Sequence, residues 1–205
     1  EHGRHRQANT CLRNQVAVVL GFFGMRRRSE VTLSRDGKLG LKREHVALSP
    51  GSHVTLFLQS MKNDTYATGN EIYLAWVTQS GVAIGELFQR YIAWLDAAAI
   101  PPDAPFLCPT DPHGRFTVPA PGKCFNPTDC LRHGLAQVFQ EFVDNPSLLS
   151  QFSWHSLRRG GATHAAHARV PPRHIMGHGV WRSEEGIRPY IINNFRSLLG
   201  VTEAM

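Results

Sequence analysis

The stretch SWHSLRRGGATHAA, residues 153–166, decides how the rest of the chain is interpreted. His155 and Arg158 are three residues apart, so on a helix an imidazole and a guanidinium share one face. Gly160 and Gly161 would each cost about 1 kcal/mol relative to alanine inside that helix. Close approach by another backbone is the usual reason to keep such glycines, and we expect one here. The stretch has the residues of half an anion-binding site.

The overall charge of the chain favours an anionic partner. The 205 residues carry a formal net charge of +6 with histidine neutral, which suits a polyanion such as nucleic acid. The longest apolar run, VAVVLGFFGM at 16–25, is too short to span a bilayer and lacks the cleavage pattern of a signal peptide. The cysteines are too few for a disulfide framework, which predicts a reduced intracellular setting. They are Cys11, Cys108, Cys124 and Cys130.

Hydrophobic patterning predicts a mainly α-helical domain with a small antiparallel β-sheet, an α+β fold. Short β-branched and aromatic runs predict strands at 45–48, 54–60 and 70–76. Helices are predicted at 8–24, 27–34, 80–98, from Thr128 as N-cap, from Ser153 as N-cap, from Pro172, and over 183–199 with a break at Pro189. The proline-rich segment 101–127 is predicted to be mostly loop, and Tyr91 to lie in the core.

Further residues extend the anion-site pattern on both sides of the opening stretch. In FFGMRRRSEV, residues 22–31, Arg27 lies three residues before Glu30. In QSMKND, residues 59–64, Lys62 lies at a predicted hairpin turn. In GVWRSEEGIRPYI, residues 179–191, Trp181 lies nine residues before Tyr190.

In this order and spacing the chain resembles the catalytic domain of the tyrosine recombinases, the phage-integrase family. The resemblance runs from Arg27 to Tyr190. The family's arginine in an R-x-x-E pattern, its hairpin lysine, its H-x-x-R box, its His or Trp, and its tyrosine nine residues later are matched here by Arg27, Lys62, His155, Arg158, Trp181 and Tyr190. The segments SLRRGGAT and GVWRS are most similar to recombinases of eukaryotic mobile elements such as DIRS-type retrotransposons.

The resemblance implies a role for each of these residues. Arg27 and Arg158 would hold the non-bridging oxygens of a phosphodiester, and Trp181 would donate its indole N–H to one of them. Tyr190 would be the nucleophile, with His155 exchanging its proton and Lys62 protonating the 5′-oxygen that leaves. Glu30 would orient an arginine. The implied product is a 3′-phosphotyrosyl link, so religation needs neither ATP nor a metal and no cofactor is expected.

Two positions leave room for other assignments. The run RRR offers three arginines, and only the spacing to Glu30 selects Arg27; Arg26 and Arg28 are expected to matter less. His178 lies where many family members carry a histidine after glycine, but the nine-residue offset to Tyr190 favours Trp181. Taken alone, Lys62 would be a surface lysine and Trp181 a core aromatic residue.

The histidines allow a zinc site to be considered. His174 and His178 are four residues apart, as are metal ligands on one helix face, and a similar pair lies at His164 and His167. However, no glutamate follows His174 as an H-E-x-x-H motif requires, and the pair Cys124 and Cys130 is too widely spaced. We therefore expect no metal.

The family resemblance also implies the wider setting. Residues 1–205 would be one catalytic domain, without the N-terminal core-binding domain that completes a clamp around DNA. The expected partners are double-stranded DNA and further copies of the chain, as a tetramer on DNA, with no membrane involved. The protein would work with DNA in the nucleus of a eukaryote or the cytoplasm of a bacterium. The alternatives are a catalytically inactive DNA-binding relic of the same fold and a type IB topoisomerase that only relaxes DNA.

Overall fold

A computed structural model describes residues 2–32, 40–58, 69–111, 113, 115–118 and 125–191 of the chain. Lys62 and Cys124 lie outside the described residues, as does the part of the last predicted helix beyond residue 191. The elements, in chain order, are α1 (His2–Phe22), α2 (Arg28–Val31), η1 (Arg43–His45), β1 (Val46–Ser49), β2 (His53–Leu58), β3 (Asn70–Ala75), α3 (Ile84–Ala97), α4 (Pro127–Val138), α5 (Gln140–Asp144), α6 (Pro146–Ser150), α7 (Trp154–His167), α8 (Pro172–Gly179), α9 (Glu184–Ile187) and η2 (Arg188–Tyr190). Among the described helices, none has both the length and the apolar character that a bilayer crossing requires.

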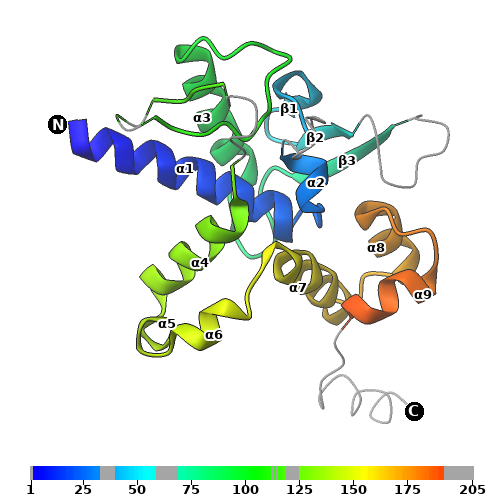
Figure 1. The fold of residues 1–205 in the computed structure, drawn as a ribbon. Coiled ribbons are helices and arrows are strands. Elements are labelled where there is room, and N and C mark those ends of the chain that lie inside the picture. Colours follow the sequence, from blue (N-terminus) through cyan, green and yellow to red (C-terminus); the bar gives the residue numbers. More distant parts are fainter. Residues whose placement is uncertain are drawn as a thin grey trace, which may run out of the picture.

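The long helix α1 organises the domain. It runs across the molecule and contacts α3, α4 and, near its C-terminal end, α7 (Figure 1). Its buried residues recur at helical spacing, so one face of the helix enters the core. These residues are Leu12, Val16, Val19 and Leu20. The predicted helix at 8–24 is confirmed, and it begins earlier than the apolar pattern indicates.

The three strands form one antiparallel sheet in the order β1-β2-β3. Alternate residues of β2 are buried, because successive side chains of a strand point to opposite faces. Leu56 lies at the centre of this inner face, paired with Val46 on one side and Ile72 on the other. The predicted strands and their antiparallel arrangement are confirmed, and so is the mainly helical fold class.

Tyr91 on α3 lies in the core, as predicted. Its side chain is fully buried, its hydroxyl donates to the carbonyl of Phe106 at 2.8 Å, and it accepts from the amide of Cys108 at 3.2 Å. Burial raises the pKa of this phenol well above its ordinary value. Tyr91 is therefore satisfied where it stands and is not available for chemistry at the surface.

The helical segment after residue 125 differs from its prediction. Thr128 is not the N-cap: Asn126 is, because Pro127 takes the first helical position and the Asn126 side chain accepts the amide N–H of Thr128 at 3.2 Å. The predicted single helix also divides at Phe139, which is extended, so that α4 ends at Val138 and α5 follows. The short helix α6 was not predicted.

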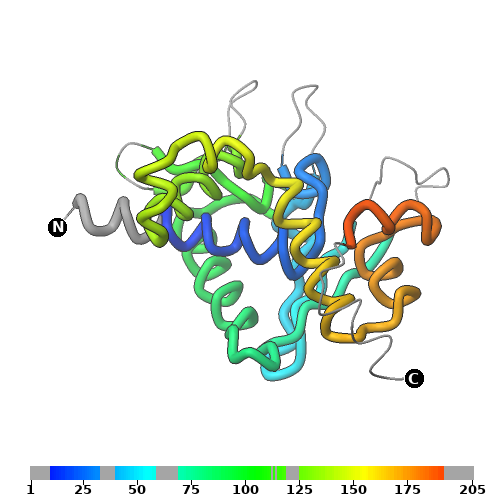
Figure 2. The backbone as a smooth tube through the Cα atoms, turned by 90° about the horizontal axis from the view of Figure 1, so that it is seen from below, coloured from blue at the N-terminus to red at the C-terminus, as the bar shows by residue number. Residues whose placement is uncertain are grey.

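The C-terminal elements pack as a second, smaller unit beside the main core. Figure 2 shows α7 lying between the end of α1 and α8, with α9 beyond. A separate hydrophobic cluster fills this region, and it is formed by Met25, Ala162, Ile175, Trp181 and Ile187, with Tyr190 packed against it. The break predicted at Pro189 is present, because the α-helix ends at Ile187 and a 3₁₀ turn carries Tyr190.

Candidate active site

The two glycines of α7 allow it to touch α1. A Cβ atom on Gly161 would lie 2.1 Å from the carbonyl oxygen of Phe22, and one on Gly160 would lie 3.1 Å from the Phe22 ring. A backbone oxygen cannot move aside as a flexible side chain can, so alanine would force the helices apart. The close approach predicted from the sequence is confirmed. This contact between α7 and the end of α1 positions the helix that carries His155 and Arg158.

The R-x-x-E spacing has a direct local cause at the start of α2. Arg27 is the N-cap residue and Glu30 the third residue of the helix, the arrangement of a capping box. The Glu30 carboxylate accepts the Arg27 amide N–H at 2.9 Å and the Arg27 guanidinium at 2.6 Å. Glu30 is buried, whereas the Arg27 side chain keeps 28% of its surface exposed. The buried Glu30 thus holds the Arg27 guanidinium at the protein surface, where a ligand can reach it.

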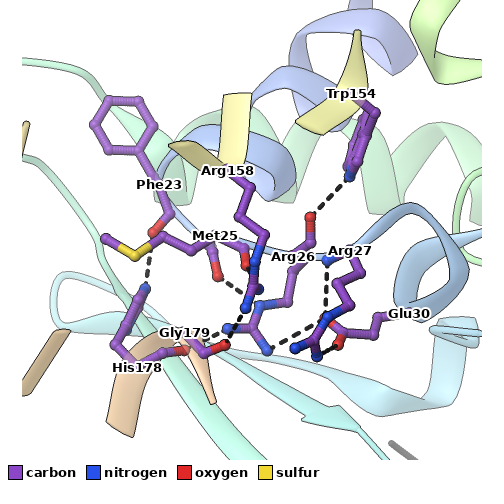
Figure 3. A network of polar contacts seen from close by, with 10 residues as sticks. Phe23, Met25, Arg26, Arg27, Glu30, Trp154, Arg158, His178 and Gly179 are labelled. Atoms are coloured by element: carbon purple, nitrogen blue, oxygen red, sulfur yellow. Dashed lines mark hydrogen bonds and ion pairs between the residues drawn. The ribbon is translucent and has the colours of Figure 1, made fainter. Parts of the chain in front are cut away.

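The three consecutive arginines have three different environments. Arg28 is exposed, Arg27 is half-buried, and Arg26 is completely buried. A fully buried guanidinium must be bonded and cannot be a solvated charge, so Arg26 has a different environment from Arg28. The contacts of Arg26 are shown in Figure 3. The expectation that both matter less than Arg27 for cleavage stays a prediction.

Arg158 is also completely buried, and its guanidinium lies near the rings of Trp181 and Tyr190. Its guanidinium donates to the carbonyl oxygens of Met25 and Gly179, the latter at 2.9 Å, and its Nε–H has no partner among the described residues. The central carbon of the guanidinium lies 3.9 Å from the centroid of the Trp181 ring. Burial, and next the positive charge of Arg27, lower the pKa of Arg158 to about 10. The group is still charged at neutral pH.

Trp181 fits its place because Gly179 has no side chain. A Cβ atom on Gly179 would lie 1.6 Å from the Trp181 ring. The indole is 9% exposed, and its Nε1–H is buried without a partner among the described residues. A buried donor without a partner costs free energy, so this atom is suited to an acceptor that arrives with a ligand.

His178, the competing histidine, faces away from this site. Its Nε2 lies 2.8 Å from the carbonyl oxygen of Phe23, and because a carbonyl only accepts, that nitrogen carries the hydrogen. Burial lowers the pKa of His178. The nitrogen that His178 would offer to a ligand is therefore already bonded within the protein, and the choice of Trp181 over His178 stays a prediction.

Tyr190 lies close to His155, Trp181 and Arg158, the residues with which the sequence motif groups it. Its ring centroid is 4.9 Å from that of His155 and 5.1 Å from that of Trp181, and 5.6 Å from the Arg158 guanidinium carbon. Thr163 of α7 donates its hydroxyl to the Tyr190 carbonyl at 2.6 Å, which ties the turn to the helix. Tyr190 is partly exposed.

His155 is exposed at the start of α7 and is neutral at pH 7. Its pKa is lowered, first by partial burial and then by the positive charges of Arg158, Arg159 and Arg27. A neutral imidazole next to a phenol can accept its proton. The structure therefore brings together Arg27, Glu30, His155, Arg158, Trp181 and Tyr190, while Lys62 is outside the described residues.

Sequence reasoning did not identify the structural contacts behind this site, although it named Arg26 and His178 as competing candidates. Arg26 and His178 join the segments that carry Arg27 and Trp181, and the Trp154 indole of α7 donates to the Arg26 carbonyl at 2.7 Å. A run of three arginines is usually solvated, so the sequence holds no signal that one of them is buried. Within the part of the chain that the structure describes, no three His, Cys, Asp or Glu residues gather as metal ligands would.

Comparison with known proteins gives one sequence relative and several similar folds. No family model matches the chain. The chain is 26% identical over 181 residues to an integrase/recombinase, a XerD homologue from Selenomonas ruminantium, covering 88% of this chain and 47% of that protein.

Several solved structures have a similar fold, among them those of the XerH and XerA recombinases. The XerH site-specific recombinase, in a post-cleavage complex with a palindromic difH substrate, matches with a TM-score of 0.54 and 15% identity over 96% of this chain and 46% of its own. The XerA recombinase matches with a TM-score of 0.54 and 16% identity over 99% of this chain and 62% of its own. The chain thus spans about half the length of the XerD homologue and of XerH.

Proposed function

We propose that this chain cleaves and rejoins DNA strands through Tyr190, because it is similar in sequence to a XerD-homologue integrase/recombinase and has a fold similar to those of the XerH and XerA recombinases. The observation that carries the proposal is the position of the Tyr190 ring, 4.9 Å from His155 and 5.6 Å from the buried guanidinium of Arg158. A phenol between a neutral imidazole and a fixed positive charge is placed to lose its proton and attack a phosphate.

In the proposed first step, the Tyr190 hydroxyl oxygen attacks the phosphorus of a DNA phosphodiester and His155 takes the phenol proton. The bond from phosphorus to the 5′-oxygen breaks, leaving a 3′-phosphotyrosyl link and a 5′-hydroxyl. Attack on that link by the 5′-hydroxyl of another strand reverses the step and releases Tyr190. One phosphoester bond replaces another, so the atoms balance without ATP, an oxidant or any other co-reactant.

The buried donors of the site suit the charge that develops on the phosphate. Arg27 is accessible, and the Nε–H of Arg158 and the indole N–H of Trp181 are unpartnered among the described residues. Donors that are fixed before the reaction stabilise a developing oxyanion without having to reorganise.

Lys62 is expected to donate a proton to the leaving 5′-oxygen. This part of the proposal rests only on the resemblance to the recombinase family. A Lys62→Ala variant should cleave much more slowly, and a substrate with sulfur at the bridging 5′ position should restore most of the rate, because a thiolate leaves without a proton. Equal defects on the oxygen and sulfur substrates would remove Lys62 from this role.

Double-stranded DNA as the substrate is supported by the net charge of +6 and by the integrase/recombinase relative. We also propose that residues 1–205 are one catalytic domain and that four copies assemble on two duplexes. The DIRS-type subfamily, and a nuclear or cytoplasmic location, stay predictions from the sequence.

The test is covalent capture from a pool of nicked DNA duplexes of randomised sequence. The nick lets the strand beyond the cleavage site diffuse away, which traps the protein on the DNA. We expect a denaturant-resistant adduct with the full chain, no adduct with Tyr190→Phe, and an undiminished adduct with Tyr73→Phe, a control at an exposed tyrosine. No adduct with the unmodified chain would favour the inactive relic. Relaxation of a supercoiled plasmid without any recombinant product would favour a topoisomerase.

A further inference from the structure

Arg26 connects two segments that lie far apart in the sequence. Its Nε–H donates to the carbonyl of Gly24 and its Nη2 to the carbonyl of His178, 152 residues away. Arg158 bridges the same two segments one residue further along each, from Met25 to Gly179 (Figure 3). Two guanidinium groups thus bind consecutive carbonyls on both sides.

The side chain of His178 adds a third link between these segments. Its Nε2–H donates to the Phe23 carbonyl at 2.8 Å, so residues 23–25 are tied in order to residues 178–179. A non-glycine residue in the left-handed region ends the first segment and directly follows the second: Met25 with φ 52° and Val180 with φ 54°. Such conformations persist only where surrounding contacts hold them. The arginines supply contacts of this kind on both sides.

The two tied segments lead directly into the candidate active site. Arg27 follows Arg26 in the chain, and Trp181 follows the left-handed Val180. Arg26 itself has no exposed surface, so it cannot touch a phosphate. Its remaining nitrogen, Nη1, lies 3.7 Å from the Glu30 carboxylate without a hydrogen bond. The carboxylate that orients Arg27 therefore lies between two guanidinium groups.

The charge of Arg26 adds to the electrostatics of the site, in addition to the bridging contacts that its planar guanidinium makes. Arg26, Arg27 and Arg158 bring three positive charges to one carboxylate, Glu30, in a largely buried place. Burial, more than any other cause, lowers the pKa of Arg26 to about 10, and Glu30 opposes that shift. Arg26 is therefore charged at neutral pH, and the cluster has more positive than negative charge before any ligand binds.

We propose that Arg26 is a positioning residue for the strand-transfer reaction: its guanidinium sets the distance between Arg27 and Trp181 by bridging the segments that carry them. The predicted effect of Arg26 on catalysis rests on the proposed function. The predicted effect of Arg26 on the position of Trp181 does not rest on it, because that position can be measured without DNA.

The first test reads the position of Trp181 in the folded protein. In the full chain, the indole N–H signals of the four tryptophans are recorded by ¹H–¹⁵N NMR for the unmodified protein, for Arg26→Met and for the exposed neighbour Arg28→Met. Methionine has a similar length and no donor, so it fills the space without bridging. We expect Arg26→Met to shift the Trp181 and Trp154 signals and to leave Trp76 and Trp94 in place, and Arg28→Met to shift none. An unshifted Trp181 signal in Arg26→Met would overturn the proposal.

The second test separates positioning from DNA binding. Single-turnover cleavage of the captured nicked duplex is measured at saturating DNA, beside the affinity for that duplex. A misplacement of about 1 Å costs about 100-fold in rate, so Arg26→Met should lose about that much while its affinity changes little. Arg28→Met should keep its rate. Equal loss of affinity and rate, or no loss of rate in a folded Arg26→Met protein, would contradict a positioning role.

A lysine variant keeps the proposal testable if Arg26→Met does not fold. The ammonium of Arg26→Lys keeps the charge but is a compact donor that cannot span both carbonyls as the planar guanidinium does. We expect it to fold, to shift the Trp181 signal, and to cleave more slowly than the unmodified chain. A folded Arg26→Lys protein with an unmoved Trp181 signal and full activity would mean that charge alone matters. If no cleavage occurs in any protein while the Trp181 signal still moves, the proposed function fails and the positioning contact stands.

Discussion

The Trp181 ring lies against the guanidinium of Arg158, with the guanidinium carbon 3.9 Å from the ring centroid. A cation is attracted to the negative face of an aromatic ring, so this contact keeps the buried Arg158 charge in place. The indole Nε1–H meanwhile has no partner among the described residues. The pair is therefore stabilised internally and still has a donor available for an anion.

The indole N–H is expected to matter more for rate than for stability. Trp181→Phe keeps an aromatic face on Arg158 but removes the donor. Loss of one donor to a developing oxyanion costs about 100- to 1,000-fold in rate, and we expect a loss of that order in single-turnover cleavage. The midpoint of chemical unfolding should change little. The control is Trp94→Phe on α3, which should cleave normally; normal cleavage by Trp181→Phe would exclude a role for the N–H.

The glycine contact between α7 and α1 gives a prediction about stability. Gly161→Ala should lower the free energy of unfolding by about 1–3 kcal/mol, the usual cost of overpacking, because its Cβ would meet the Phe22 carbonyl oxygen at 2.1 Å. The matched control is Gly134→Ala in α4, where a Cβ meets nothing within 4 Å. That change should stabilise by up to about 1 kcal/mol through helix propensity. Urea unfolding measures both, and a shift of the same sign in the two variants would contradict the packing account.

The half-buried His178 predicts how stability depends on pH. Burial lowers its pKa below the ordinary histidine value of 6.5, so the unfolded chain binds a proton more readily than the folded one. The His178 contribution to stability is therefore complete above pH 6.5 and is lost as the pH falls from there through the folded-state pKa. His178→Gln keeps a neutral donor that can reach the Phe23 carbonyl but does not titrate. We expect the variant to lose less stability than the unmodified chain between pH 7 and pH 5; identical losses would show that His178 is not held neutral.

The sequence predicts the elements better than their ends. The strands follow from alternating β-branched residues, and α7 follows from Ser153 and the glycines that permit its contact with α1. The N-cap at Asn126 was missed because Thr128 is also a good capping residue, and only the position of Pro127 decides between them. The break at Phe139 has no glycine or proline to mark it.

In the candidate site, the sequence likewise predicts the local contacts better than the long-range ones. Residues whose spacing is set along one helix or turn, such as Arg27 with Glu30, can be recognised in the sequence because the spacing reflects a local bond. The burial of Arg26 could not be, because it depends on the carbonyl of His178, 152 residues away, and on the packing of α7 and α8 against the end of α1. A long-range contact leaves no periodic trace in a single sequence.

The central claim, that Tyr190 forms the covalent bond to DNA, is tested most directly by mapping the adduct. The trapped protein is digested with protease and nuclease, and the peptide that keeps a nucleotide is identified by mass spectrometry. We predict one phosphotyrosyl nucleotide, on Tyr190, because the other described tyrosines are unsuited to attack: Tyr91 is buried, and Tyr73 donates its hydroxyl to Glu71. A nucleotide on Tyr66, Tyr73 or Tyr91, or an adduct that survives in Tyr190→Phe, would contradict the account.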